Sequence, residues 1–69
     1  MNGNVEPDYY ERVLAAFRQN GTTLRHWCRE HGVNPTSARH ALTGYANGPR
    51  SFEIRRLVAE ALARLEEAA

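Results

Sequence analysis

A thiol and an imidazole stand three residues apart at Cys28 and His31, with two further histidines close by in the sequence. Such groups bind zinc, and a Cys–His pair can also act in nucleophilic catalysis. Helical spacing places both side chains on the same face as Leu24 and Trp27, where core or boundary residues are expected. The spacing of a four-ligand zinc site is missing, and no third group is placed to orient the pair. We therefore expect no metal, no cofactor and no enzymatic activity.

Between Asn34 and Gly44 the sequence alternates small apolar residues with hydrogen-bonding ones. At about 100° per residue in a helix, one side of this stretch carries Ala38, Ala41, Leu42 and Tyr45. The opposite side carries hydroxyl, guanidinium and imidazole groups, at Thr36, Ser37, Arg39, His40 and Thr43. A guanidinium can bond the O6 and N7 atoms of guanine together, and hydroxyl groups can contact bases or phosphates. The pattern favours a helix that contacts DNA bases, with Arg39 as the leading reader and the other four as further candidates.

The charge distribution along the chain also favours a polyanionic partner. The formal net charge is only +1, but residues 12–56 hold eight arginines against two acids. All nine basic residues are arginine, whose planar guanidinium can grip phosphate or guanine at two points. The alternative interpretation is a solvated charged face, with the arginine preference reflecting a GC-rich genome.

Length and composition limit the classes of function. At 69 residues the chain is expected to form one domain, with apolar residues for one core and little room for an enclosed substrate pocket. A single cysteine excludes a disulfide framework and suits a reducing compartment. No apolar run approaches the roughly 20 residues of a membrane span, and no secretion signal follows Met1. We expect a cytoplasmic protein with no membrane partner.

Four helices are expected to position these side chains. Pro7 and Asp8 precede the first helix, and capping side-chain oxygens occur at Thr22 or Thr23, Asn34 and Ser51. Helix-stop signals, which are glycines, occur at Gly21, Gly32 and Gly44. We therefore expect an all-α, compact four-helix domain over residues 7–67, with a flexible arm at 1–6 and a frayed end at 68–69.

Only about three residues, centred on Gly32, separate the second helix from the third. Glycine supplies the backbone conformation of a sharp turn, small Cys28 lets the helices approach, and Val33 fills the space between them. A short helix, a glycine turn and a second short helix make the helix-turn-helix arrangement, whose second helix lies in the DNA major groove. In the fourth helix Phe52 lies off the apolar stripe; we favour packing at the helix start over a partner surface.

An ordered set of residues between Leu24 and Leu62 resembles the Cro/repressor-like helix-turn-helix family. The set comprises Cys28 where the family usually has alanine, Gly32-Val33, Leu42-x-Gly44, Pro49, Ile54 and Val58-Ala59-Glu60-Ala61-Leu62. The chain is most similar to the Ner-type regulators of Mu-like transposable bacteriophages. His31 and Ala38 depart from the family pattern, which has apolar and branched residues there. The resemblance implies a lambda-repressor-like fold, a third helix that reads bases, and a place in the cytoplasm of a bacterial host cell.

Contacts to the DNA backbone are expected to flank the reading helix, because such contacts fix register and supply salt-sensitive affinity. The candidates are Thr22, Thr23, Arg25, Asn34 and Arg50. Exposed N–H groups at the start of the third helix also favour a phosphate. For Arg29, Arg55 and Arg56, a solvated face or a helical ion pair, such as Arg56 with Glu60, is at least as good an interpretation.

The leading hypothesis is a sequence-specific transcriptional regulator, a repressor of phage or prophage genes. We expect it to bind double-stranded DNA as a homodimer, because one small domain contacts few bases and half-sites of this motif lie about 34–36 Å apart. Tyr9, Phe52 and the end of the fourth helix are candidate dimer surfaces. Two alternatives are a DNA-shaping accessory factor for transposition or excision, and a protein-interaction module, such as an anti-repressor, that keeps the fold without DNA affinity.

Overall fold

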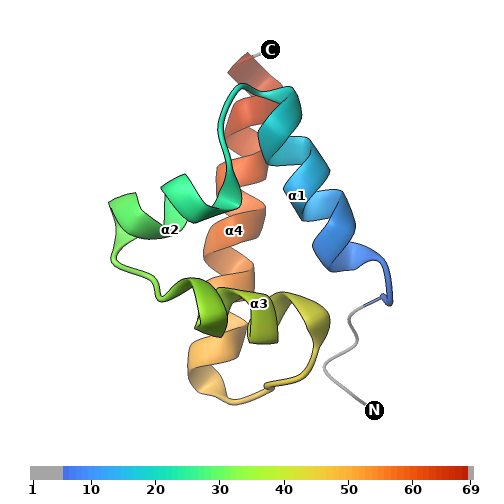
Figure 1. The fold of residues 1–69 in the computed structure, drawn as a ribbon, viewed down its shortest axis with the longest axis vertical. Coiled ribbons are helices and arrows are strands. Elements are labelled where there is room, and N and C mark those ends of the chain that lie inside the picture. Colours follow the sequence, from blue (N-terminus) through green and yellow to red (C-terminus); the bar gives the residue numbers. More distant parts are fainter. Residues whose placement is uncertain (1–5, 69) are drawn as a thin grey trace.

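The computed structural model describes residues 6–68, and this part of the chain is built from four helices joined by short turns. The helices are α1 (Tyr9–Gln19), α2 (Leu24–His31), α3 (Pro35–Thr43) and α4 (Pro49–Ala68) (Figure 1). The prediction of an all-α, four-helix domain is confirmed. Most of the arm expected at 1–6, and the last residue of the end expected to fray, lie outside the described residues.

The helix boundaries follow from local capping. The Thr23 hydroxyl oxygen accepts a hydrogen bond from the His26 amide at 3.1 Å, so Thr23 rather than Thr22 caps α2. The Asn34 side-chain oxygen accepts from the amides of Thr36 and Ser37, at 2.8 and 3.3 Å, and starts α3. Left-handed glycines end α2 and α3, with φ of 66° at Gly32 and 81° at Gly44. These predicted starts and ends are confirmed.

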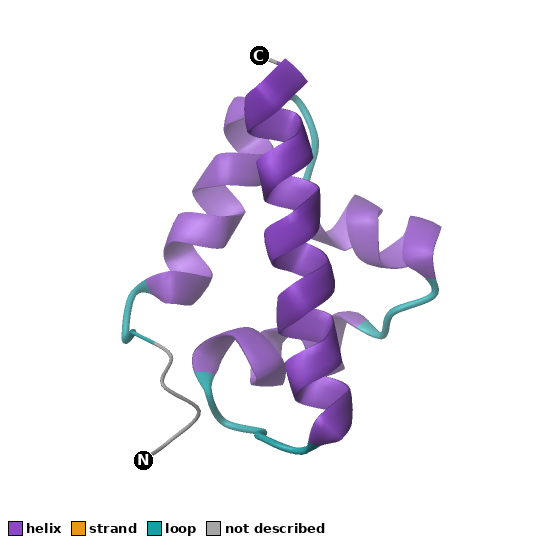
Figure 2. Ribbon diagram, turned by 180° about the vertical axis from the view of Figure 1, so that it is seen from behind, coloured by secondary structure: helices purple, strands orange, loops and turns teal. Residues whose placement is uncertain are grey.

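Helix α4 forms one side of the molecule, and α1, α2 and α3 lie together on its other side (Figure 2). Helix α3 contacts each of the other three helices, so its position is fixed from several directions. The buried apolar residues that join the two sides are Val13, Phe17, Leu24, Trp27, Cys28, Val33, Ala38, Ala41, Leu42, Ile54 and Val58. No described helix is both long and apolar enough to cross a membrane.

Three predictions about the region after α3 are wrong. Helix α4 begins at Pro49, not at a capping Ser51, because proline suits the first helical turn; Ser51 is buried inside that helix. Tyr45 was expected on the inner face of the third helix, but it is 79% exposed. The left-handed Gly44 takes the chain out of the helix one residue earlier, so helical spacing no longer applies there. Phe52 was expected to pack at the helix start, but it is 54% exposed.

Arg55 holds the turn between α3 and α4. Its guanidinium donates to the carbonyl oxygens of Ala41 at 2.7 Å and Ala46 at 3.4 Å, and lies 4.6 Å from the Phe52 ring. The Ala41 carbonyl also accepts from the Gly44 amide at 3.3 Å, so this arginine adds a second, charged donor at the end of α3. The sequence interpretation of Arg55 as a solvated or ion-paired residue is therefore wrong. The helical pair of Arg56 with Glu60, at 2.9 Å, is confirmed.

Candidate nucleic-acid interface

Helices α2 and α3 are joined by a three-residue turn over residues 32–34. The Val33 amide donates to the Cys28 carbonyl at 2.9 Å, across the left-handed Gly32, and the Val33 side chain is buried. Asn34 then starts α3 at once. Two short helices joined by a glycine turn have the order and spacing of a helix-turn-helix.

Helix α3 is divided into a buried side and a polar side. Ala38, Ala41 and Leu42 have no exposed surface. The side chains predicted to read bases are exposed at Thr36, Ser37, Arg39 and Thr43 and half-buried at His40. Because the buried side is mostly methyl groups, α3 packs close to its neighbours while its hydrogen-bonding groups stay in solvent.

Some groups on this polar side are already engaged. The Asn34 cap occupies the amides of Thr36 and Ser37, so these two N–H groups are not free to bind a phosphate as the sequence suggested. The Thr43 hydroxyl donates to the His40 carbonyl at 3.3 Å. A ligand on this surface would therefore bind to its side chains rather than to these backbone amides.

Tyr45 extends the polar side of α3 beyond its last turn. Its ring lies 4.7 Å from the His40 ring, centroid to centroid, and most of its surface is exposed. Sequence reasoning missed Tyr45 because it continued the helical period through Gly44. The signal that could have found it is Gly44 itself, since a glycine helix stop reorients every side chain after it.

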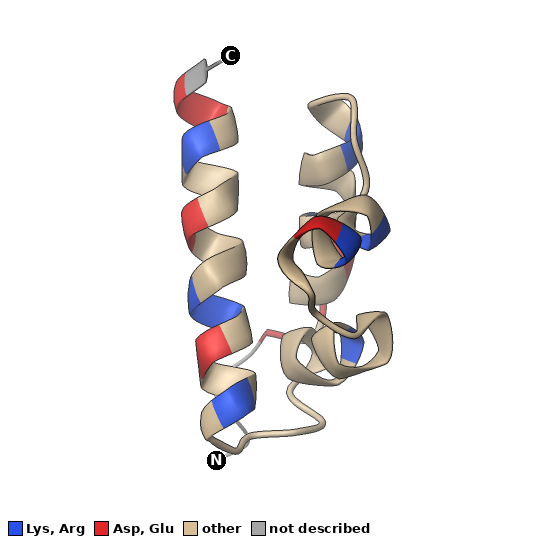
Figure 3. Cartoon of the chain, turned by 90° about the vertical axis from the view of Figure 1, so that its left-hand side faces the viewer, with Lys and Arg blue, Asp and Glu red and all other residues tan. Residues whose placement is uncertain are grey.

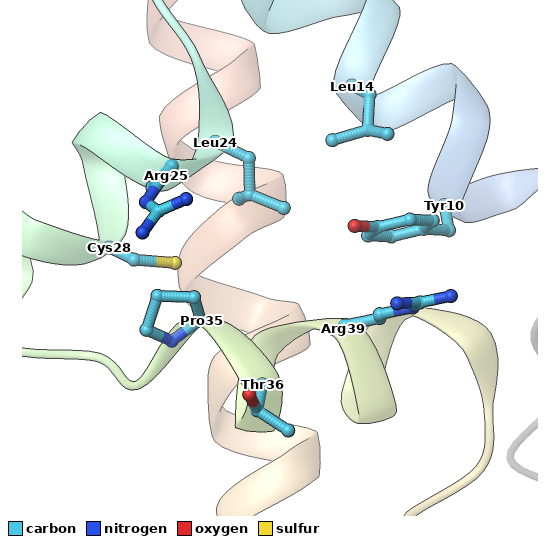
Figure 4. Close-up of a pocket in the computed structure, with 8 residues that line it drawn as sticks. All are labelled: Tyr10, Leu14, Leu24, Arg25, Cys28, Pro35, Thr36 and Arg39. Carbon is cyan, nitrogen blue, oxygen red and sulfur yellow. The ribbon is translucent and has the colours of Figure 1, made fainter.

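A hollow of about 270 Å³ opens between α1, α2 and α3 on the side of the molecule away from α4 (Figure 4). Its lining is part apolar and part cationic: Tyr10, Leu14, Leu24, Arg25, Cys28, Pro35, Thr36 and Arg39. Three of these residues, Arg25, Thr36 and Arg39, were predicted to contact DNA, so the hollow brings together candidates from α2 and α3. The Arg39 guanidinium lies 5.9 Å from the centroid of the Tyr10 ring.

The predicted backbone contacts differ in how free they are. Arg25 is exposed and makes no ion pair among residues 6–67. Arg50, by contrast, donates to the Glu53 carboxylate at 2.8 Å. Thr23 uses its hydroxyl oxygen as a cap, and Thr22 is half-buried. Among the residues predicted to contact the DNA backbone, Arg25 therefore has the side chain with the fewest interactions within the described protein.

Charge is arranged differently on the two sides of the molecule. Along α4, basic and acidic segments alternate (Figure 3). The opposite charges within the Arg50–Glu53 pair, and within the Arg56–Glu60 pair, neutralise each other. Helix α3 contains no acid, and the single acid of α2, Glu30, lies 3.3 Å from the His26 ring. The side formed by α2 and α3 is therefore better suited to a polyanion than α4 is.

Cys28 and His31 do not combine into a reactive site. Cys28 has no exposed surface, and burial raises the pKa of its thiol, which disfavours the thiolate that acts as nucleophile or metal ligand. His31 is exposed at the boundary of the core; its ring stacks on Trp27 at 4.6 Å and its Nδ1 lies 2.9 Å from the Trp27 carbonyl. Within the described chain, no three potential metal ligands come together.

Comparison with protein-family models, curated proteins and solved structures finds no match to this chain.

Proposed function

We propose that the chain is a DNA-binding domain that lays the polar side of α3 into the major groove. The observation that carries this proposal is the division of α3, in which three residues without exposed surface oppose a row of hydrogen-bonding side chains. A helix anchored by methyl groups keeps its outer side chains in solvent, and the B-DNA major groove admits one α-helix. The absence of acids from α3 removes the repulsion that phosphates would otherwise cause.

Within that class, we propose a sequence-specific transcriptional regulator, a repressor of phage or prophage genes in the cytoplasm of a bacterial host. The support is the resemblance of residues 24–62 to the Cro/repressor-like family and, within it, to Ner-type regulators. Two copies on neighbouring half-sites would supply the base contacts that one domain lacks.

The roles proposed for individual residues follow their geometry. Arg39 reads a guanine through two hydrogen bonds, and Thr36 with His40 contacts neighbouring bases or phosphates. Arg25 and Arg50 bind phosphates on either side of α3, and Tyr45 contacts the backbone at the end of that helix.

Selection of bound sequences from a random duplex pool tests this function. The wild-type protein is expected to enrich one sequence, and Arg39→Ala is expected to relax the preference at one base pair, worth roughly 1–3 kcal/mol of discrimination. Arg64→Ala is the matched control, because Arg64 is exposed on α4, away from α3. Recovery of random sequence by the wild-type protein would refute the proposal.

The second candidate function is a protein-interaction module. The exposed aromatic rings of Tyr45 and Phe52 favour it, because exposed aromatic side chains are enriched where proteins bind each other. For such a module, Arg39→Ala would leave weak, non-selective DNA binding unchanged.

A further inference from the structure

Tyr10 belongs to α1, yet it lies over a residue of the candidate reading helix. Its side chain is half-buried and packs against the core. Figure 4 shows the Tyr10 ring directly above the Arg39 side chain, on one wall of the hollow. The Arg39 Cζ atom is 5.9 Å from the ring centroid, within the range of a cation–π contact.

Arg39 has little else to hold it. Among residues 6–67 it makes no ion pair and no hydrogen bond, and it is exposed. A free arginine side chain samples many rotamers, and part of its binding free energy is lost when DNA fixes one of them. An aromatic ring that restricts the rotamers of the arginine before DNA binds reduces this loss of binding free energy.

We propose that Tyr10 is a positioning residue for Arg39, so that α1 helps to set the base selectivity of α3. This inference rests on the proposed function. Tyr10 acts through the face of its ring rather than through its hydroxyl, because the hydroxyl makes no hydrogen bond to any described residue. Loss of the ring should therefore weaken discrimination, whereas loss of the hydroxyl alone should not.

The chain contains a matched control for this contact. Tyr9, the neighbouring residue of α1, lies 5.9 Å from the Arg12 guanidinium, the same separation as in the Tyr10–Arg39 pair. Both members of that control pair belong to the first turn of α1, and neither lines the hollow. Removing the Tyr9 ring thus breaks an aromatic–guanidinium contact of the same separation that does not involve Arg39.

The experiment measures the ratio of affinities for two duplexes that differ at the base pair where Arg39→Ala relaxes selection. Any loss of affinity that is common to both duplexes cancels in this ratio. Tyr10→Leu should lower the ratio about two- to fivefold, the range expected for an exposed cation–π contact. Tyr10→Phe and Tyr9→Leu should keep the wild-type ratio, and Tyr10→Leu should have no further effect in the Arg39→Ala background.

A wild-type ratio for Tyr10→Leu would overturn the inference, as would an equal loss in the Arg39→Ala background. Either result leaves the proposed function standing, whereas failure of the wild-type protein to prefer any duplex overturns both. Circular dichroism checks that the variants fold. Should Tyr10→Leu lose helical signal, Tyr10→Met removes the ring with a more adaptable side chain, and the same ratios decide.

Discussion

At the scale of single residues, the arginines divide by what they already touch. Arg50 and Arg56 each form an ion pair with a glutamate on α4. The Arg55 guanidinium donates a hydrogen bond to the Ala41 carbonyl in α3. Arg25 and Arg39 make no ion pair within the described chain. A paired arginine has to give up its partner before it binds phosphate, so its net contribution to DNA affinity is smaller than that of an unpaired one.

The salt dependence of binding tests the phosphate contact of Arg50. Arg50→Ala is expected to weaken binding to all sequences about equally and to lower the slope of log K against log salt by roughly one. Glu53→Gln is the complementary variant, since it frees Arg50 from its 2.8 Å partner and should strengthen binding to all sequences. A slope that stays at the wild-type value in Arg50→Ala would remove Arg50 from the interface.

Tyr45 makes a different prediction because its side chain is uncharged. Tyr45→Ala is expected to lower DNA affinity while leaving the salt slope unchanged, since no counterion is released by a neutral contact. Its effect on the free energy of unfolding should stay within about 0.5 kcal/mol, because the side chain is 79% exposed. Affinity equal to wild type would show that Tyr45 lies outside the DNA contact.

At the scale of helices, the features predictable from the sequence are those that a few neighbouring residues determine. Asn34 with Pro35 starts α3 and Gly32 ends α2, because capping and left-handed backbone are local properties. The same holds for the two sides of α3, which helical spacing alone separates. These local signals were enough to predict most of the residues of the candidate site.

Two contacts that the sequence did not predict join residues that are far apart along the chain. The bond from Arg55 to the Ala41 carbonyl spans fourteen positions and exists only because α4 turns back along α3. The contact of Tyr10 with Arg39 likewise needs α1 and α3 side by side. Periodicity within one helix carries no information about either pair.

Arg55 and Arg56 provide a test of this difference between neighbours in one helix. Arg55→Ala is expected to cost about 1–3 kcal/mol of the free energy of unfolding, because the part-buried Ala41 carbonyl loses its side-chain donor. Arg56→Ala breaks only an exposed ion pair and should cost no more than about 0.5 kcal/mol. Urea unfolding followed by circular dichroism measures both, and equal costs would show that Arg55 does not hold the turn.

At the scale of the whole molecule, one small core holds α3 in place. Trp27 of α2 is buried, and its ring centroid lies 6.3 Å from that of Phe17 in α1. A domain of this length has a free energy of unfolding of roughly 3–10 kcal/mol. The stability lost with one large core side chain is therefore comparable with the stability of the entire domain. The shape of the side that is proposed to contact DNA therefore depends on residues of the core.

Trp27→Ala is expected to cost on the order of 3–5 kcal/mol and to abolish helical signal at 37 °C. Trp27→Phe should cost less, because it keeps an aromatic ring and removes an indole N–H that is buried without a partner among the described residues. Thermal unfolding compares the two variants. Retained helicity in Trp27→Ala at 37 °C would contradict the place of Trp27 in the core.

The most direct test of the account is a map of backbone amide NMR signals, recorded as the wild-type protein is titrated with the duplex obtained by selection. We predict the largest signal changes in α3 and at the start of α2, smaller changes at the start of α4 near Arg50 and in α1 near Tyr10, and none in the middle of α4 around the Arg56–Glu60 pair. Changes concentrated on α4 around Phe52, or no changes on α3 at saturating duplex, would contradict the claim that α3 reads DNA.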